Sequence, residues 1–124
     1  QQHRGYVVKS QGDGFMLAFP SAALALRACL AMRDRIGKGF EDHRINIRAG
    51  LHSGEAIKRD DDFYGHTVVI AARIGSLAQG GEILASDLVH ALSRGLGSFK
   101  FGEARHATLR GLDGSFALFP VLNE

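Results

Sequence analysis

The first third of the chain has a hydrophobic pattern that predicts a strand pair followed by a helix. Two short apolar runs within residues 5–19 flank Gly12-Asp13-Gly14, and an Asp-Gly pair between such runs is typical of a hairpin turn. Ser21 can then cap a helix, because apolar residues follow at helical spacing to about Ile36. We therefore expect Asp13 at a hairpin tip.

The middle of the chain predicts a second hairpin and a second helix. Apolar and polar residues alternate over 45–51 as in a half-buried strand, and Gly54 is expected to turn the chain into a partner strand at 55–58. The three aspartates at 60–62 indicate an acidic loop. Apolar residues over 68–77 then follow a helical period.

The last third predicts short strands around one helix. A strand is expected over 82–85, and Ser86 can cap a helix that runs to about Ser93. Further strands are predicted near Lys100, near Thr108 and over 116–121. Strands and helices alternate irregularly, so we expect one α+β domain over residues 1–124, with helices packed on one face of a mostly antiparallel sheet.

Composition excludes several classes of protein. The 124 residues contain one cysteine, so a disulfide framework is excluded. The formal net charge is +2 and the basic residues are scattered, which is weak support for nucleic-acid binding. No apolar stretch reaches the roughly 20 residues of a membrane helix. Without a signal-peptide pattern, the expected location is the cytoplasm.

Few polar residues suggest chemistry when each is considered alone. Asp13 could have no role beyond forming the turn, and Lys9 could simply belong to an edge strand of the sheet. Arg73 stands within an apolar helix and therefore needs either an anion or an ion pair with the acidic loop. The six histidines show no metal-ligand spacing. His52 and Ser53 are neighbours on a strand and point to opposite faces, which argues against a nucleophile pair.

Taken in order, five segments resemble the catalytic domain of the class III adenylate and guanylate cyclases. The segments are VKSQGDGF at 8–15, IRAGLHSGE at 47–55, DFYGHTVVIAAR at 62–73, GEILAS at 81–86 and LRGL at 109–112. The resemblance covers nearly the whole chain. It implies a ferredoxin-like, palm-type fold and the conversion of ATP to 3′,5′-cyclic AMP and pyrophosphate.

The resemblance also assigns roles to particular residues. Asp13 matches a metal-binding aspartate, which implies two divalent cations, Mg²⁺ or Mn²⁺. Lys9 and Asp62 match the pair that reads adenine. Arg73 matches the arginine that stabilises charge on the phosphate, and Arg110 matches a basic residue for the triphosphate. The family assembles its sites across a head-to-tail homodimer, and a sensor or effector domain is expected in the same protein.

Two departures from the family pattern lower the expected activity. The family's first metal aspartate lies on a strand upstream of the hairpin, so we expect this chain to be an N-terminally truncated cyclase domain. The family's asparagine, four residues before the arginine, is replaced by Val69. The resemblance implies that this asparagine holds the ribose ring oxygen, and the aliphatic side chain of Val69 has no group that can do so.

The sequence leaves two other interpretations open. A catalytically degenerate cyclase-homology module could bind nucleotide, or only dimerise, and so regulate a larger protein; Val69 favours this interpretation. A diguanylate cyclase is a more remote alternative, because Gly12-Asp13-Gly14 lacks the acidic pair of such domains. The presence of all five site residues together favours the adenylate cyclase.

Overall fold

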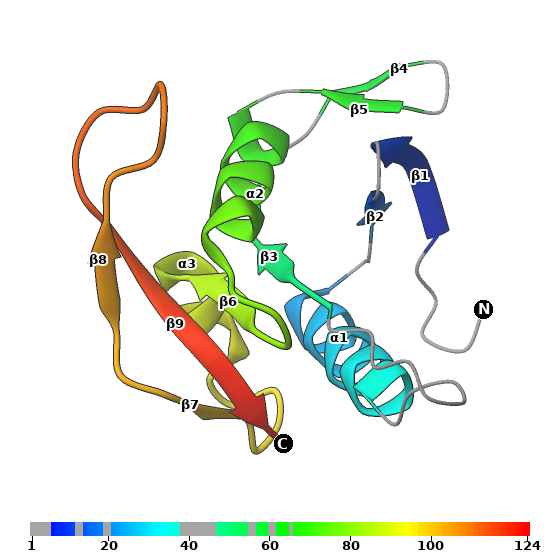
Figure 1. The fold of residues 1–124 in the computed structure, drawn as a ribbon, viewed down its shortest axis with the longest axis vertical. Coiled ribbons are helices and arrows are strands. Elements are labelled where there is room, and N and C mark those ends of the chain that lie inside the picture. Colours follow the sequence, from blue (N-terminus) through cyan, green and yellow to red (C-terminus); the bar gives the residue numbers. More distant parts are fainter. Residues whose placement is uncertain are drawn as a thin grey trace.

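The computed structural model describes most of the chain. The described residues are 6–11, 14–18, 21–37, 47–54, 57–59, 62–64 and 66–124. They form the helices α1 (Ala22–Gly37), α2 (His66–Leu77) and α3 (Asp87–Ser93). The strands are β1 (Tyr6–Gln11), β2 (Gly14–Ala18), β3 (Ala49–Leu51), β4 (Ile57–Arg59), β5 (Asp62–Tyr64), β6 (Ile83–Ser86), β7 (Lys100–Phe101), β8 (Arg105–Ala107) and β9 (Phe116–Asn123) (Figure 1).

The predicted N-terminal hairpin is confirmed. Strands β1 and β2 pair antiparallel from Tyr6 opposite Ala18 to Gln11 opposite Gly14, with an irregularity between Val7 and Lys9. Their connection at Asp13 lies outside the described residues. The two strands form a sheet of their own beside the larger one (Figure 1).

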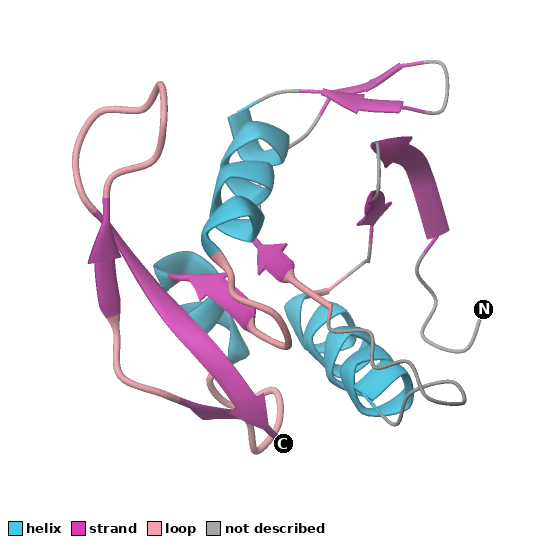
Figure 2. Ribbon diagram, viewed as in Figure 1, coloured by secondary structure: helices cyan, strands magenta, loops and turns pink. Residues whose placement is uncertain are grey.

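The larger sheet is built around the long strand β9. Strand β6 pairs antiparallel with one side of β9, and β8 and β7 pair antiparallel with its other side. Strand β3 extends the sheet beyond β6, to which it is parallel. Figure 2 shows these strands interleaved with helices, and the predicted α+β class is confirmed.

The predicted second hairpin is wrong. Strand β3 was expected to pair with residues 55–58, but it pairs with β6 instead, while β4 pairs with β5. Asp62, predicted to lie in an acidic loop, is a strand residue of β5 opposite Arg59. Alternation along a strand shows which residues face the core, but it does not show which strand is the neighbour.

Two hydrophobic clusters lie on opposite faces of β6. Ile83 and Ala85 belong to a cluster with α1 and α3, whereas Leu84, between them, belongs to a cluster with α2. Successive strand residues point to opposite faces. The helices are therefore divided between the two faces, and the expectation that all of them cover one face is wrong for α2.

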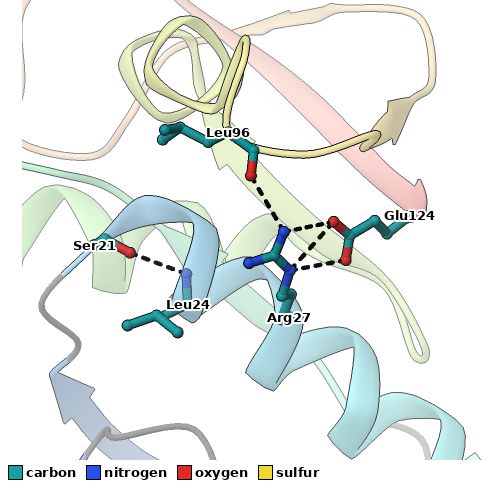
Figure 3. A network of polar contacts seen from close by, with 5 residues as sticks. All are labelled: Ser21, Leu24, Arg27, Leu96 and Glu124. Atoms are coloured by element: carbon teal, nitrogen blue, oxygen red, sulfur yellow. Dashed lines mark hydrogen bonds and ion pairs between the residues drawn. The ribbon is translucent and has the colours of Figure 1, made fainter.

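Serine caps begin two of the helices where the sequence predicted them. The backbone N–H of Leu24 donates to Ser21 Oγ at 3.2 Å ahead of α1, and that of Val89 donates to Ser86 Oγ at 3.2 Å ahead of α3. These bonds satisfy N–H groups that have no acceptor within the helix. Figure 3 shows the Ser21 cap beside Arg27.

Helix α1 is tied to the C-terminal end of β9 by arginine. Arg27 Nη2 lies 2.8 Å from Glu124 Oε2 and donates to the carbonyl of Leu96 at 3.2 Å (Figure 3). Hydrogen bonding to Glu124 raises the pKa of Arg27 and lowers that of the Glu124 carboxyl. Further along α1, Arg33 donates to the backbone carbonyls of Val121 and Leu122. These contacts fix the direction of α1 relative to the sheet.

The thiol of Cys29 is predicted to be unreactive in the native protein. Burial raises its pKa to about 12, so the nucleophilic thiolate is a very small fraction of the thiol at pH 8. We expect Ellman's reagent at pH 8 to leave native Cys29 unmodified and to titrate one thiol after unfolding in guanidinium. Rapid modification of the folded protein would contradict this burial.

The described helices include none that is long and apolar enough to cross a membrane. Helix α2, which is the more apolar of the two longer helices, has 12 residues. A bilayer span needs roughly 20 residues.

Candidate functional site

Helix α2 and the segment that follows β8 bring two predicted site residues together. Arg73, in the middle of α2, donates from Nε to the backbone carbonyl of Arg110 at 3.1 Å. The two residues are 37 positions apart in sequence. Arg73 is half-buried and Arg110 is exposed. The structure therefore gathers two guanidinium-bearing residues from separate elements at one place on the surface.

A tight turn presents Arg110. The N–H of Leu112 donates to the carbonyl of Leu109 at 3.0 Å, and Gly111 has a φ of +79°. Leu109 is 3% exposed and belongs to the same hydrophobic cluster as Ile70 and Ile74 of α2. The turn is thus attached to the helix that carries Arg73.

Val69 lies one helical turn before Arg73 on α2. Its side chain is 43% exposed, although it is a large hydrophobic residue. Residues four apart lie on the same face of a helix. The surface beside Arg73 is therefore aliphatic at the position where the resemblance implies an asparagine.

The structure places the strands of Lys9 and Asp62 next to one another. Lys9 lies in β1 opposite Met16, and Asp62 lies in β5 opposite Arg59. Strand β1 contacts β5, and β5 contacts α2 (Figure 1). These backbones thus connect the position of Lys9 to the helix of Arg73. A contact between the Lys9 and Asp62 side chains, which are not described, stays a prediction.

The described residues do not by themselves form a metal centre. No group of three or more His, Cys, Asp or Glu side chains capable of holding a metal occurs among them. Asp13, the predicted metal ligand, lies outside the described part of the chain. Its role is therefore still a prediction from sequence.

Sequence reasoning missed two contacts around these residues. One is the backbone carbonyl of Arg110 as the acceptor for Arg73; the only signal was the glycine that follows Arg110. The other joins His52 to Ser86, with 2.8 Å between Nδ1 and Oγ. Ser86 was predicted only as a helix cap, and the parallel pairing of β3 with β6 brings the two residues together.

Comparison with known proteins gives a consistent set of similarities. The family model for the adenylate and guanylate cyclase catalytic domain matches residues 1–121. An adenylate cyclase of Mycosarcoma maydis is 36% identical, in an alignment that covers 77% of this chain and 5% of that protein. A pH-sensitive adenylate cyclase of Mycobacterium tuberculosis is 30% identical, over 94% of this chain and 30% of that protein.

Solved structures show the same similarity. The crystal structure of an adenylate/guanylate cyclase/hydrolase from Silicibacter pomeroyi is 26% identical and has a TM-score of 0.88. The match covers 99% of this chain and 74% of that one. The chain thus spans about three quarters of this structure and less than a third of the two curated relatives.

Proposed function

The chain belongs to the adenylate and guanylate cyclase catalytic domain family, and on that premise we propose that it is an adenylate cyclase domain that converts ATP to 3′,5′-cyclic AMP and pyrophosphate. The observation that carries this proposal is the 3.1 Å hydrogen bond that joins Arg73 to the backbone of Arg110. It joins the side chain of Arg73 to the backbone of Arg110, which supports a shared role for these two residues at the triphosphate.

The reaction explains why such a pair is useful. The ribose 3′-hydroxyl loses its proton to water and its oxygen attacks the α-phosphorus. The bond from this phosphorus to the bridging oxygen breaks, and pyrophosphate leaves with the electron pair. Catalysis of phosphoryl transfer depends on positioning and on cations near the phosphate oxygens. A planar guanidinium can contact two such oxygens at once. We assign Arg73 to the charge that develops on the phosphate, and Arg110 to the triphosphate.

Lys9 and Asp62 are assigned to the adenine ring. A lysine can donate to a ring nitrogen, and a carboxylate can accept from the exocyclic amine. Guanine presents the opposite hydrogen-bonding edge, so this pair favours ATP over GTP. The contact between β1 and β5 supports the assignment, because it brings together the two strands that carry these residues.

The family is generally metal-dependent, and we assign two divalent cations, Mg²⁺ or Mn²⁺, to this domain. Asp13 would supply one carboxylate, which is the hard oxygen donor that these ions prefer. When bound, the cations would neutralise charge on the phosphates. The described residues add no carboxylate cluster of their own.

The functional unit in this proposal is a head-to-tail homodimer. Both Val69 and Leu77 of α2 are more than 40% exposed, which leaves apolar surface beside Arg73 for a second subunit. The curated relatives are several times longer than the aligned region, which supports a fused sensor or effector domain.

The test is the detection of cyclic AMP by mass spectrometry from ATP and Mn²⁺, with GTP in parallel, using the natural protein that carries this chain. We expect cyclic AMP in excess of cyclic GMP. Asp13→Ala should lower the product about 100-fold or more, since loss of a metal ligand costs several kcal/mol in the transition state. Asp34→Ala, which removes an exposed carboxylate of α1, is the matched control and should leave the rate unchanged.

A second candidate function is a non-catalytic regulatory module of the same fold. The exposed aliphatic side chain of Val69 beside Arg73 favours it. A folded protein that yields no cyclic nucleotide from either substrate would contradict the adenylate cyclase proposal and support this alternative. Nucleotide binding would then be the property to measure.

A further inference from the structure

The turn at Leu109–Leu112 has a geometry that fixes the direction of one carbonyl. It is closed by the 3.0 Å hydrogen bond from Leu112 N–H to Leu109 O, and its third residue, Gly111, has a φ of +79°. A φ near +80° at this position is that of a type II turn. Types I and II differ mainly in the orientation of the peptide between the second and third residues. Gly111 therefore determines where the carbonyl of Arg110 points.

That carbonyl points at the guanidinium of Arg73. It accepts the Nε–H of Arg73 at 3.1 Å. Because the guanidinium is planar, a hydrogen bond at Nε sets the orientation of the whole group. Within the part of the chain that the structure describes, Nε is the only guanidinium nitrogen of Arg73 with a protein acceptor. No described residue accepts a hydrogen bond from either terminal nitrogen of Arg73.

The turn is itself held against α2. Leu109 is 3% exposed in the cluster that contains Ile70 and Ile74, and Leu112 packs against the same cluster. Ile74 directly follows Arg73 and is fully buried. The donor and the acceptor of the Arg73–Arg110 bond are therefore anchored to one piece of core, and the orientation of the guanidinium exists before any ligand binds.

We infer that the 109–112 turn is a positioning element for Arg73, and that Gly111 is the residue on which it depends. The inference rests on the proposed function in one respect: a fixed guanidinium plane is useful because the guanidinium must contact two adjacent oxygens of a phosphate at the same time. An alanine at 111 favours the type I geometry, because L residues with a Cβ rarely adopt a left-handed φ. The Arg110 carbonyl then turns away from Arg73.

The chain provides a matched control for this substitution. Gly95 has the same φ of +79°, and an added Cβ would meet nothing within 4 Å at either Gly95 or Gly111. Gly95→Ala therefore imposes the same backbone strain without touching Arg73. Gly111→Asn is a rescue variant, since asparagine enters the left-handed region more readily than alanine.

The first measurement is solvent exchange of the arginine Nε–H groups by ¹⁵N NMR, with the Arg73 signal assigned through its loss in Arg73→Lys. In the wild type and in Gly95→Ala we expect this proton to exchange at least about tenfold more slowly than that of exposed Arg94. Gly111→Ala should lose the protection, and Gly111→Asn should keep most of it. Protection that persists in Gly111→Ala, or that is lost equally in Gly95→Ala or Gly111→Asn, overturns the inference.

The second measurement is the rate of cyclic AMP formation. We expect kcat to fall roughly 10- to 100-fold in Gly111→Ala, with a smaller change in KM, because a misplaced catalytic group affects the transition state more than binding. A kcat equal to that of Gly95→Ala overturns the positioning role. If the wild type yields no cyclic nucleotide, the proposed function fails, and the NMR comparison still decides whether the turn orients Arg73.

Discussion

Replacing Gly50 with alanine is expected to destabilise the domain severely. Gly50 lies in β3 where the strand crosses α2, and an added Cβ would stand 2.2 Å from Gly75 N and 2.6 Å from Ala71 O. Both are backbone atoms, so no side-chain rotation can relieve the overlap. The strand and the helix must separate, which costs about 3 kcal/mol or more and lowers Tm by about 10 °C or more.

The reciprocal substitution provides the control. At Gly75 a Cβ would make ordinary contacts, with Gly50 N at 3.4 Å as the nearest atom. Alanine is also the better helix former by about 0.5–1 kcal/mol. Thermal unfolding followed by circular dichroism should show Gly75→Ala at or slightly above the wild-type Tm. Equal melting of Gly50→Ala and the wild type would mean that β3 and α2 are not packed this closely.

The sequence correctly predicted those elements whose structure depends on residues close together in the chain. The hairpin of β1 and β2 was predicted from an Asp-Gly pair between apolar runs, and Ser21 and Ser86 cap helices where an oxygen can accept from exposed N–H groups. Helix α2 begins at His66, two residues before its predicted start. In each case, the residues that decide the structure lie within one turn of one another.

Contacts between distant segments were not predictable in the same way. The pairing of β3 with β6 depends on a partner more than thirty residues away, and the alternation of β3 suits a hairpin equally well. Gly50 is unremarkable in sequence, yet it is where the backbones of β3 and α2 meet. The acceptor for Arg73 is a carbonyl, which every residue possesses, so no residue type could have marked it.

In the candidate site, too, the sequence identified residues but not the contacts between distant segments. Family resemblance placed five residues in one site, and for two of them, Arg73 and Arg110, the structure supplies a direct hydrogen bond. For Lys9 and Asp62 it supplies adjacent strands, and the metal-binding role of Asp13 stays a prediction from the family resemblance. The resemblance could name these residues, but the orientation of Arg73 depends on a turn that only the folded chain reveals.

Removing the Arg73 side chain is expected to have the largest effect on activity among the arginine positions. In the proposed reaction its guanidinium faces negative charge that increases in the transition state, and the loss of one such preorganised donor costs about 100- to 1,000-fold in kcat. Arg73→Ala should therefore lower kcat for cyclic AMP by about this factor, while KM for ATP changes less. The assay is steady-state formation of cyclic AMP by the natural protein.

Two variants separate this role from a general effect of charge or folding. Arg73→Lys keeps the positive charge but loses the planar fork and the Nε–H that donates to Arg110, so it should recover only a small part of the rate. Arg94→Ala removes an exposed arginine at the end of α3, whose cap bond to Ala91 uses the backbone N–H. It should therefore match the wild type in both rate and Tm. If Arg73→Lys were fully active, charge alone would suffice, and neither the guanidinium plane nor the turn that orients it would contribute to the reaction.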